Sequence, residues 1–306
     1  MNNAVLYVIT VLVWGTTWFA IKLQVGHAPD EISIFYRAAF SAIFLLIWCK
    51  INKFSLSFKL IDHVFLCGLG LSMFSLHYLC VYSATSYIVS GIVAVVFSSV
   101  SFLSIINHFI FFRIKPGFNV SLGALLGISG LCIFFWHEIT QTALESNTLK
   151  GLELAAAGTF IFSLGSSISK RNNNNSLDII PSMAMGMLYG TLAMLIYIIT
   201  NSTPFVLPTS IIYWGSLSYL VILGSIVGFL CYLKLIKNIG PELASYTTIL
   251  FPAVALIVSS VLEGYYWSIS DLVGLIFVVL GNIIAIRKKS VLMHLPRLKT
   301  LIFKQF

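Results

Sequence analysis

The sequences VWGTTWFAIK at residues 13–22 and IFSLGSSISK at residues 161–170 decide the fold, because they occupy corresponding places in two halves of the chain. Aligned at an offset of 148 residues, they pair Trp14 with Phe162, and both stretches end in lysine. Each lies in an apolar run, yet each carries more hydrogen-bonding side chains than a lipid-facing helix can satisfy. We therefore expect these groups to face the interior of a helical membrane protein.

The composition is typical of a membrane protein. Of the 306 residues, 58% are hydrophobic and 9% are charged, whereas soluble domains carry about 25% charged residues. A helix needs about 20 apolar residues to cross a bilayer core about 30 Å thick. We predict an all-α polytopic protein with ten transmembrane helices, at residues 3–23, 32–50, 63–83, 88–111, 118–137, 149–169, 179–200, 211–234, 243–262 and 269–286.

Further correspondences indicate an internal duplication. YLC at residues 78–80 matches FLC at 229–231, and SGIVAVVFSS at 90–99 matches LASYTTILFP at 243–252. At an offset of 151, one glycine pair matches another, Gly123 and Gly130 with Gly274 and Gly281. The offsets agree within a few residues, so we expect two copies of one structural unit.

The duplication defines the expected domains. They are a first five-helix repeat at residues 1–137, a loop at 138–148, a second five-helix repeat at 149–287 and a basic tail at 288–306. Because each repeat has an odd number of spans, the second must cross the membrane in the opposite direction to the first. Inverted repeats are typical of secondary transporters, which bind substrate near the midplane between the repeats.

The basic residues predict the orientation of the chain. Lysine and arginine collect on cytoplasmic loops, and an inside N-terminus places fifteen of the eighteen on the inner side. We therefore expect both termini in the cytoplasm and the protein in the cell inner (plasma) membrane. Topology accounts for the net charge of +8, so no nucleic-acid partner is expected. The first run lacks the basic segment and cleavage site of a signal peptide, so we interpret it as a membrane span.

Four further features are distinctive. They are the WG pair at residues 14–15 followed by a lysine, FYRAAF at 35–40, LEG at 262–264 and the two glycine pairs. With them the sequence resembles the drug/metabolite transporter superfamily, and within it the EamA-domain family of permeases. The resemblance implies ten helices, cytoplasmic termini and export or exchange of small metabolites, often amino acids, without ATP hydrolysis. The repeats depart from symmetry where Ser99 corresponds to Pro252, and where no acid in the first repeat corresponds to Glu263.

The aromatic face of the first span is a candidate substrate site. Trp14, Thr17 and Trp18 share one face of a helix through their i, i+3, i+4 spacing. Aromatic rings in a cavity wall would bind the apolar or cationic part of a substrate. The alternative is a packing seam, since small residues and threonine let membrane helices approach closely.

Two further candidates are cationic or titratable. Arg37, next to Tyr36, and Lys22 would hold a substrate carboxylate near an outer gate, unless they extend to lipid headgroups. His77 lies mid-span beside Tyr78. It is a candidate proton site, a neutral hydrogen-bond donor to substrate, or a buried histidine satisfied by a neighbour.

The remaining predicted contacts come from spans four, six, eight and nine. They are Ser98, Ser163, Ser166, Phe229 and Tyr246. The serines of span six serve either helix packing or substrate binding opposite Trp14. No carboxylate lies at mid-membrane, so exchange or facilitated diffusion fits the sequence as well as proton coupling does.

The sequence favours a secondary transporter over an enzyme. It has no Walker A loop, no HExxH and no GxSxG motif, and its five cysteines lack CxxC spacing. We expect no enzyme activity, no metal and no cofactor, with a small-molecule metabolite and the lipid bilayer as partners of a monomer. The predicted function is transport of amino acids or related metabolites by alternating access, as exporter or exchanger. The alternatives are a receptor or scaffold and a lipid-modifying membrane enzyme.

Overall fold

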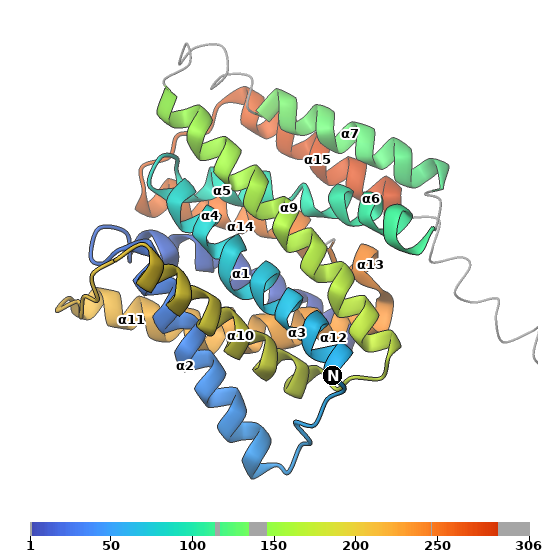
Figure 1. Ribbon diagram of the computed structural model, residues 1–306. Coiled ribbons are helices and arrows are strands. Elements are labelled where there is room, and N and C mark those ends of the chain that lie inside the picture. The colour runs from blue at the N-terminus through green and yellow to red at the C-terminus, as the bar shows by residue number, and fades with distance from the viewer. Residues whose placement is uncertain (1, 114–116, 135–145, 246, 287–306) are drawn as a thin grey trace, which may run out of the picture.

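The apolar runs fold into helices throughout the described parts of the chain, residues 2–113, 117–134, 146–245 and 247–286 of a computed structural model (Figure 1). The first half forms α1 (Asn3–Lys22), α2 (Asp30–Ile51), α3 (Leu60–Leu69), η1 (Gly70–Ser75), α4 (Leu76–Thr85), α5 (Ser90–Phe97), α6 (Val100–Phe112) and α7 (Phe118–Phe134). The second half forms α9 (Ser146–Asn174), α10 (Ile179–Thr200), α11 (Ile211–Tyr219), η2 (Leu220–Val227), α12 (Gly228–Ile239), α13 (Pro241–Ser245), α14 (Thr247–Leu262) and α15 (Ile269–Ile286). No strand occurs within these ranges.

The helices agree with the predicted all-α membrane class. Within the described residues, eight helices are long and apolar enough to cross a membrane. Two of them, Leu60–Thr85 and Ile211–Ile239, continue through the short π-helical segments η1 and η2. The last span of each repeat corresponds to a shorter apolar stretch, Ser121–Phe134 in α7 and Ile269–Gly281 in α15.

The packing of α7 against α15 demonstrates the inverted repeat. A Cβ atom added to Gly130 would lie 2.7 Å from the Gly274 carbonyl oxygen, and one on Gly281 would lie 2.5 Å from that of Gly123. Residue numbers rise along one helix as they fall along the other, so the helices are antiparallel. The corresponding glycines also exchange partners, as twofold symmetry requires. These two helices form one edge of the molecule (Figure 1).

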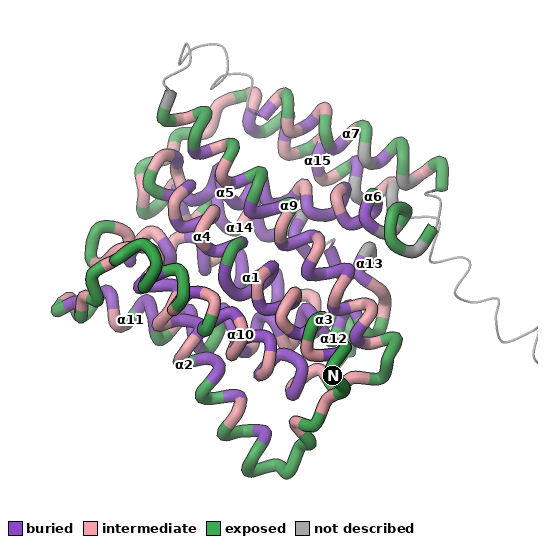
Figure 2. Tube along the Cα trace, viewed as in Figure 1, coloured by how far each residue is buried: buried purple, intermediate pink, exposed green. Residues whose placement is uncertain are grey.

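Burial separates an interior from an apolar outer face. Buried stretches follow the inward sides of α1, α4, α5 and α12, while exposed residues mark the outer sides and helix ends (Figure 2). The outer side of α2 illustrates the contrast, with Phe44, Ile47 and Trp48 each about half exposed. Exposed apolar side chains on a membrane helix are the surface that faces lipid.

The asparagine run at residues 172–175 is mostly helical. α9 continues through Asn174, and Asn172 is 3% exposed. The end of α9 is held on α3 by an ion pair of 2.7 Å between Arg171 and Asp62. This tertiary contact overrides the weak helix propensity of asparagine. α9 also begins at Ser146, inside the predicted inter-repeat loop.

Candidate substrate-binding site

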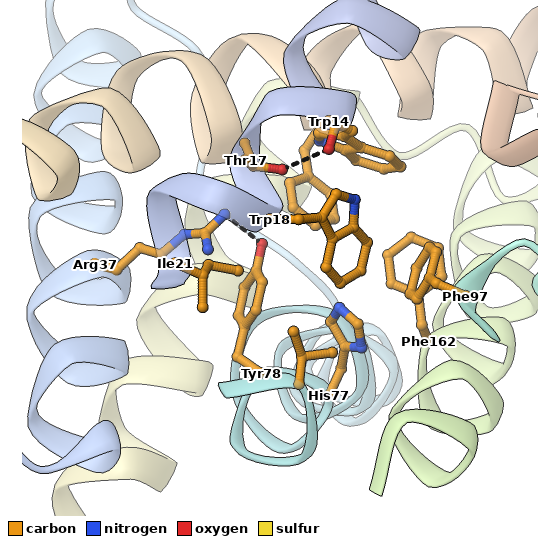
Figure 3. A pocket seen from close by; sticks show the side chains of 11 residues that line it. Trp14, Thr17, Trp18, Ile21, Arg37, His77, Tyr78, Phe97 and Phe162 are labelled. Atoms are coloured by element: carbon orange, nitrogen blue, oxygen red, sulfur yellow. Dashed lines mark hydrogen bonds between the residues drawn. The ribbon is translucent and has the colours of Figure 1, made fainter. Parts of the chain in front are cut away.

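The two repeats meet at a cavity of about 30 Å³ in the middle of the molecule, which we call the central chamber (Figure 3). A cavity of this volume holds only about one to three water molecules. The described conformation is therefore closed around its centre. The side chains that line the chamber are Trp14, Thr17, Trp18, Ile21, Arg37, His77, Tyr78, Val81, Phe97, Phe162 and Phe229.

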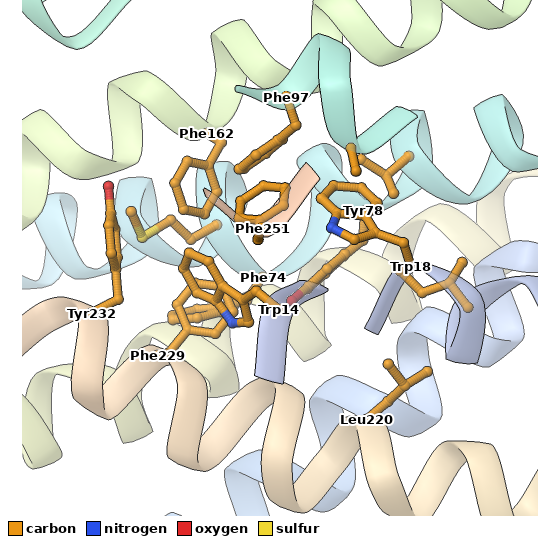
Figure 4. Packing of buried hydrophobic residues seen from close by; sticks show 14 of the residues in the cluster. Trp14, Trp18, Phe74, Tyr78, Phe97, Phe162, Leu220, Phe229, Tyr232 and Phe251 are labelled. Carbon is orange, nitrogen blue, oxygen red and sulfur yellow. The ribbon is translucent and has the colours of Figure 1, made fainter. Parts of the chain in front are cut away.

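Trp14 reaches from the first repeat into the second. Its indole nitrogen donates a hydrogen bond of 3.2 Å to the carbonyl of Gly224, inside η2. Its ring centroid lies 5.0 Å from that of Phe229 and 4.9 Å from that of Tyr232 (Figure 4). A Cβ at Gly228 would lie within 3 Å of the indole, so glycine is required there for the ring to enter.

Thr17 and Trp18 complete the contribution of α1. The Thr17 hydroxyl donates to the Trp14 carbonyl at 2.9 Å, so its proton is used within the helix. The Trp18 ring packs on Phe97 and Phe251, with centroids 5.3 and 5.6 Å away. Its indole nitrogen is buried and has no hydrogen-bond partner in the described part of the chain.

Arg37 projects from α2 into the chamber and is only 2% exposed. Its Nε donates to the Ser225 hydroxyl at 2.8 Å and its Nη2 to the Tyr78 hydroxyl at 2.7 Å (Figure 3). Its Nη1 is buried without a hydrogen-bond partner among the described residues, and none of their carboxylates forms an ion pair with it. Arg37 is thus a buried cation whose Nη1 group can donate a further hydrogen bond.

His77 points from α4 toward Trp18 and Phe162 (Figure 3). Its Nδ1 lies 3.0 Å from the Gly158 carbonyl oxygen, which can only accept a hydrogen bond. In the neutral ring Nδ1 is therefore the donor and Nε2 the acceptor. This arrangement disfavours one of the three roles considered for His77, the neutral hydrogen-bond donor to substrate, because a neutral ring has no second proton to donate.

The structure adds aromatic residues that the prediction missed. Phe97 and Phe162 line the chamber, with ring centroids 4.8 Å apart and each 5.1 Å from that of His77 (Figure 3). The repeat alignment contained a signal for Phe162, which corresponds to Trp14. The sequence contained no such signal for Phe97, because its neighbours in the chain are also apolar. Only the packing of α5 places this side chain at the chamber.

Four predicted contacts lie outside the chamber lining. Tyr36 donates to the Val206 carbonyl at 3.1 Å and stacks on Trp214. Ser98 donates to the Val95 carbonyl at 2.6 Å, within its own turn.

The two serines of α9 are also used elsewhere. Ser163 accepts from Asn107 at 2.8 Å and donates to the Phe160 carbonyl, whereas Ser166 lies 3.1 Å from the Tyr232 hydroxyl. Both hydroxyls therefore form hydrogen bonds within or between helices. This agrees with helix packing, one of the two roles that the sequence left open for them. Tyr246 lies outside the described residues.

The chamber is closed on the side of Lys22 by polar contacts between helices. Lys22 donates to the Thr85 carbonyl at 2.6 Å, and Tyr82 donates to Gln24 at 2.8 Å. Lys22 is therefore occupied at the end of α1 and does not line the chamber. Among the residues that the structure describes, no cluster of three or more His, Cys, Asp or Glu side chains is placed to bind a metal.

Comparisons with known proteins agree with this architecture. The model of the EamA-like transporter family matches residues 2–136 and 149–287. Protein PagO of Salmonella typhimurium is 23% identical over 287 residues, which cover 92% of this chain and 91% of that protein. A protein of Buchnera aphidicola subsp. Schlechtendalia chinensis, named an uncharacterized transporter, is 26% identical over 288 residues with the same two coverages. One crystal structure has a TM-score of 0.70 at 16% identity, covers 93% of this chain and 96% of its own, and thus has the same fold.

Proposed function

This chain belongs to the EamA-like transporter family, and we propose that it is a secondary carrier of small organic carboxylates, amino acids or close relatives, that binds them in the central chamber. The proposal assigns the site to Trp14, Trp18, Arg37, His77 and Phe229, which all line the chamber. Phe162 and Phe97 join them as aromatic walls. The carrier operates in the plasma membrane with both termini in the cytoplasm, as exporter or exchanger.

The observation that carries this proposal is the unpaired charge of Arg37. A buried ion is costly unless it is paired, and charged groups inside membrane proteins mark substrate or ion pathways. The partners of Arg37 are two neutral hydroxyls and the face of the Tyr78 ring, whose centroid lies 4.0 Å from Cζ, so no negative charge among the described residues balances its positive charge. A substrate carboxylate would supply the missing charge and accept a charge-assisted hydrogen bond from Nη1.

The other chamber residues suit the rest of such a substrate. The Nε2 acceptor of His77 would receive a hydrogen bond from an amino group, and the surrounding rings would cover an apolar side chain. We therefore favour neutral amino acids with apolar or aromatic side chains.

Binding requires the chamber to expand, because about 30 Å³ does not hold an amino acid. The helix irregularities around the chamber are the places where this would occur. The π-helical segments η1 and η2 occupy equivalent positions in the two repeats, and η2 supplies both the Gly224 carbonyl and Ser225. Such segments are frequent at functional sites. Alternating access would open the chamber to one side at a time by moving the repeats against each other.

Counterflow in proteoliposomes tests the proposal. Vesicles loaded with an unlabelled L-amino acid are diluted into the same labelled compound, using phenylalanine, leucine, threonine, lysine and glutamate in turn. We expect transient accumulation of label for at least one neutral amino acid, with and without a pH gradient. Phenethylamine, which lacks the carboxylate, should not drive it. Equal counterflow with amines and amino acids, or none with any acid, would contradict the proposed substrate class.

A further inference from the structure

A second cavity, of about 460 Å³, lies between the start of α1, the start of α10 and the end of α12. We call it the lateral groove. Its volume is within the range of about 300–1,000 Å³ found for small-molecule sites, and it is much larger than the central chamber. Its walls are apolar at Leu6, Ile180 and Leu230, and Lys234 and Lys237 stand at one end.

The lateral groove is separate from the central chamber because the two use different sides of α12. Phe229 and Tyr232 face Trp14, whereas Leu230, Lys234 and Lys237 line the groove. With 3.6 residues per turn, the mean directions of these two sets differ by about 140° around the helix. The groove therefore lies behind α12 as seen from the chamber, and it is not a vestibule for the proposed substrate.

The charges of the groove favour an anion. Lys234 and Lys237 are both exposed, and neither forms an ion pair within the described part of the chain. Asp178, also in the lining, is the single acid against these two lysines. Lysines one helical turn apart present two ammonium groups to the same ligand.

We propose that the lateral groove binds an anionic phospholipid. Its phosphate would contact Lys234 and Lys237, and one acyl chain would lie along the half-buried side chains of Ile179, Ile180 and Leu230. The lining joins an apolar wall to a cationic end, which is the chemistry of an amphiphile rather than of a free ion. These lysines belong to the basic set that the positive-inside pattern places at the cytoplasmic face. Basic pockets between helices on that side bind anionic headgroups.

Thermal unfolding of the full chain in detergent tests the proposal with defined lipids. Mixed micelles contain dioleoyl phosphatidylglycerol or dioleoyl phosphatidylcholine, which share acyl chains and differ in headgroup charge. We expect phosphatidylglycerol to raise Tm by about 3–6 °C more than phosphatidylcholine does. The double variant Lys234→Gln/Lys237→Gln should lose this difference. The matched control Lys50→Gln/Lys59→Gln removes two exposed inner-side lysines outside the groove lining and should retain it.

Alkylation by N-ethylmaleimide, read by peptide mass spectrometry, locates the lipid. Asn238→Cys places an exposed thiol in the groove lining, because native Cys231 is buried there, and exposed Cys132 on α7 serves as an internal reference. Phosphatidylglycerol should slow modification of this thiol about fivefold at near-saturating lipid and leave Cys132 unchanged.

Four results would overturn the proposal. They are equal effects of the two lipids, an equal loss in the control variant, equal protection by inorganic phosphate alone, and protection of the thiol of Asn238→Cys by L-phenylalanine. None of these readouts depends on transport activity.

Discussion

The helices α1 and α9 occupy equivalent places in the two repeats but contribute differently to the central chamber. At an offset of 151 residues, Gly228 corresponds to His77. The large ring of Trp14 therefore lies against a glycine, whereas the smaller ring of Phe162 faces the imidazole of His77, with centroids 5.1 Å apart. At one of the two equivalent contacts a large side chain packs on a glycine, and at the other a smaller ring packs on a larger neighbour.

The same comparison applies to charge. α2 and α10 are both 22 residues long, and aligning their first residues places Arg37 at the position of Gly186. The interior thus has one guanidinium without a symmetry-related equivalent. Duplication explains the common architecture, and divergence at a few positions gives the chamber one polar end.

Replacing Trp14 should give the largest difference between the two helices. Trp14→Ala removes a ring that contacts three aromatic side chains and lines the chamber. We expect counterflow to fall at least tenfold, with a loss of stability of about 3–5 kcal/mol. Trp14→Phe should keep the protein folded and still reduce flux, because the bond to Gly224 is lost. Normal flux in folded Trp14→Phe and Trp14→Ala would remove this residue from the site.

Gly228→Ala tests the contact between Trp14 and Gly228 from the glycine side. The added methyl would overlap the Trp14 indole, so we expect a stability loss of about 1–3 kcal/mol by thermal or denaturant unfolding. Gly215→Ala in α11 is the matched control, because no atom lies within 4 Å of its added Cβ. It should be neutral or stabilise the protein by up to about 1 kcal/mol. Equal effects of the two substitutions would mean that Trp14 does not require the glycine.

The serines of α9 should give the smallest effects on transport. Ser163→Ala removes the acceptor of Asn107, and Ser166→Ala removes the contact with Tyr232. Each lost hydrogen bond should lower stability by about 1 kcal/mol. Flux per folded molecule should change less than twofold, because neither side chain lines the chamber. A large change in flux without a change in stability would restore these serines to the site.

The sequence predicts the architecture better than the site. Helix length, hydropathy and the glycine pairs are local or periodic signals, and they give the all-α class and the inverted packing of α7 on α15. The orientation of a polar side chain depends on contacts far apart in sequence. Ser163 was a candidate because polar groups within a membrane usually face the bundle interior or a cavity, yet its hydroxyl accepts a hydrogen bond from Asn107 of α6.

Apolar site residues were the hardest to identify. Phe97 lies among similar residues in α5, so its role in the chamber wall follows only from packing. Arg37 was a candidate as a cation on the predicted outer side of the first repeat, and the structure places it in the chamber wall. Its hydroxyl partner Ser225 required the π-helical turn of η2, which no sequence pattern indicated.

The central claim is that Arg37 holds the carboxylate of the transported compound. The most direct measurement compares the affinity of the purified carrier for the amino acid identified by counterflow with its affinity for the corresponding primary amide. Loss of a buried charge pair costs about 2–5 kcal/mol, so the wild-type carrier should bind the amide at least thirtyfold more weakly. In folded Arg37→Gln the acid should bind weakly and the preference should disappear. If Arg37→Gln still prefers the acid by the wild-type factor, Arg37 does not bind the carboxylate and the account is wrong.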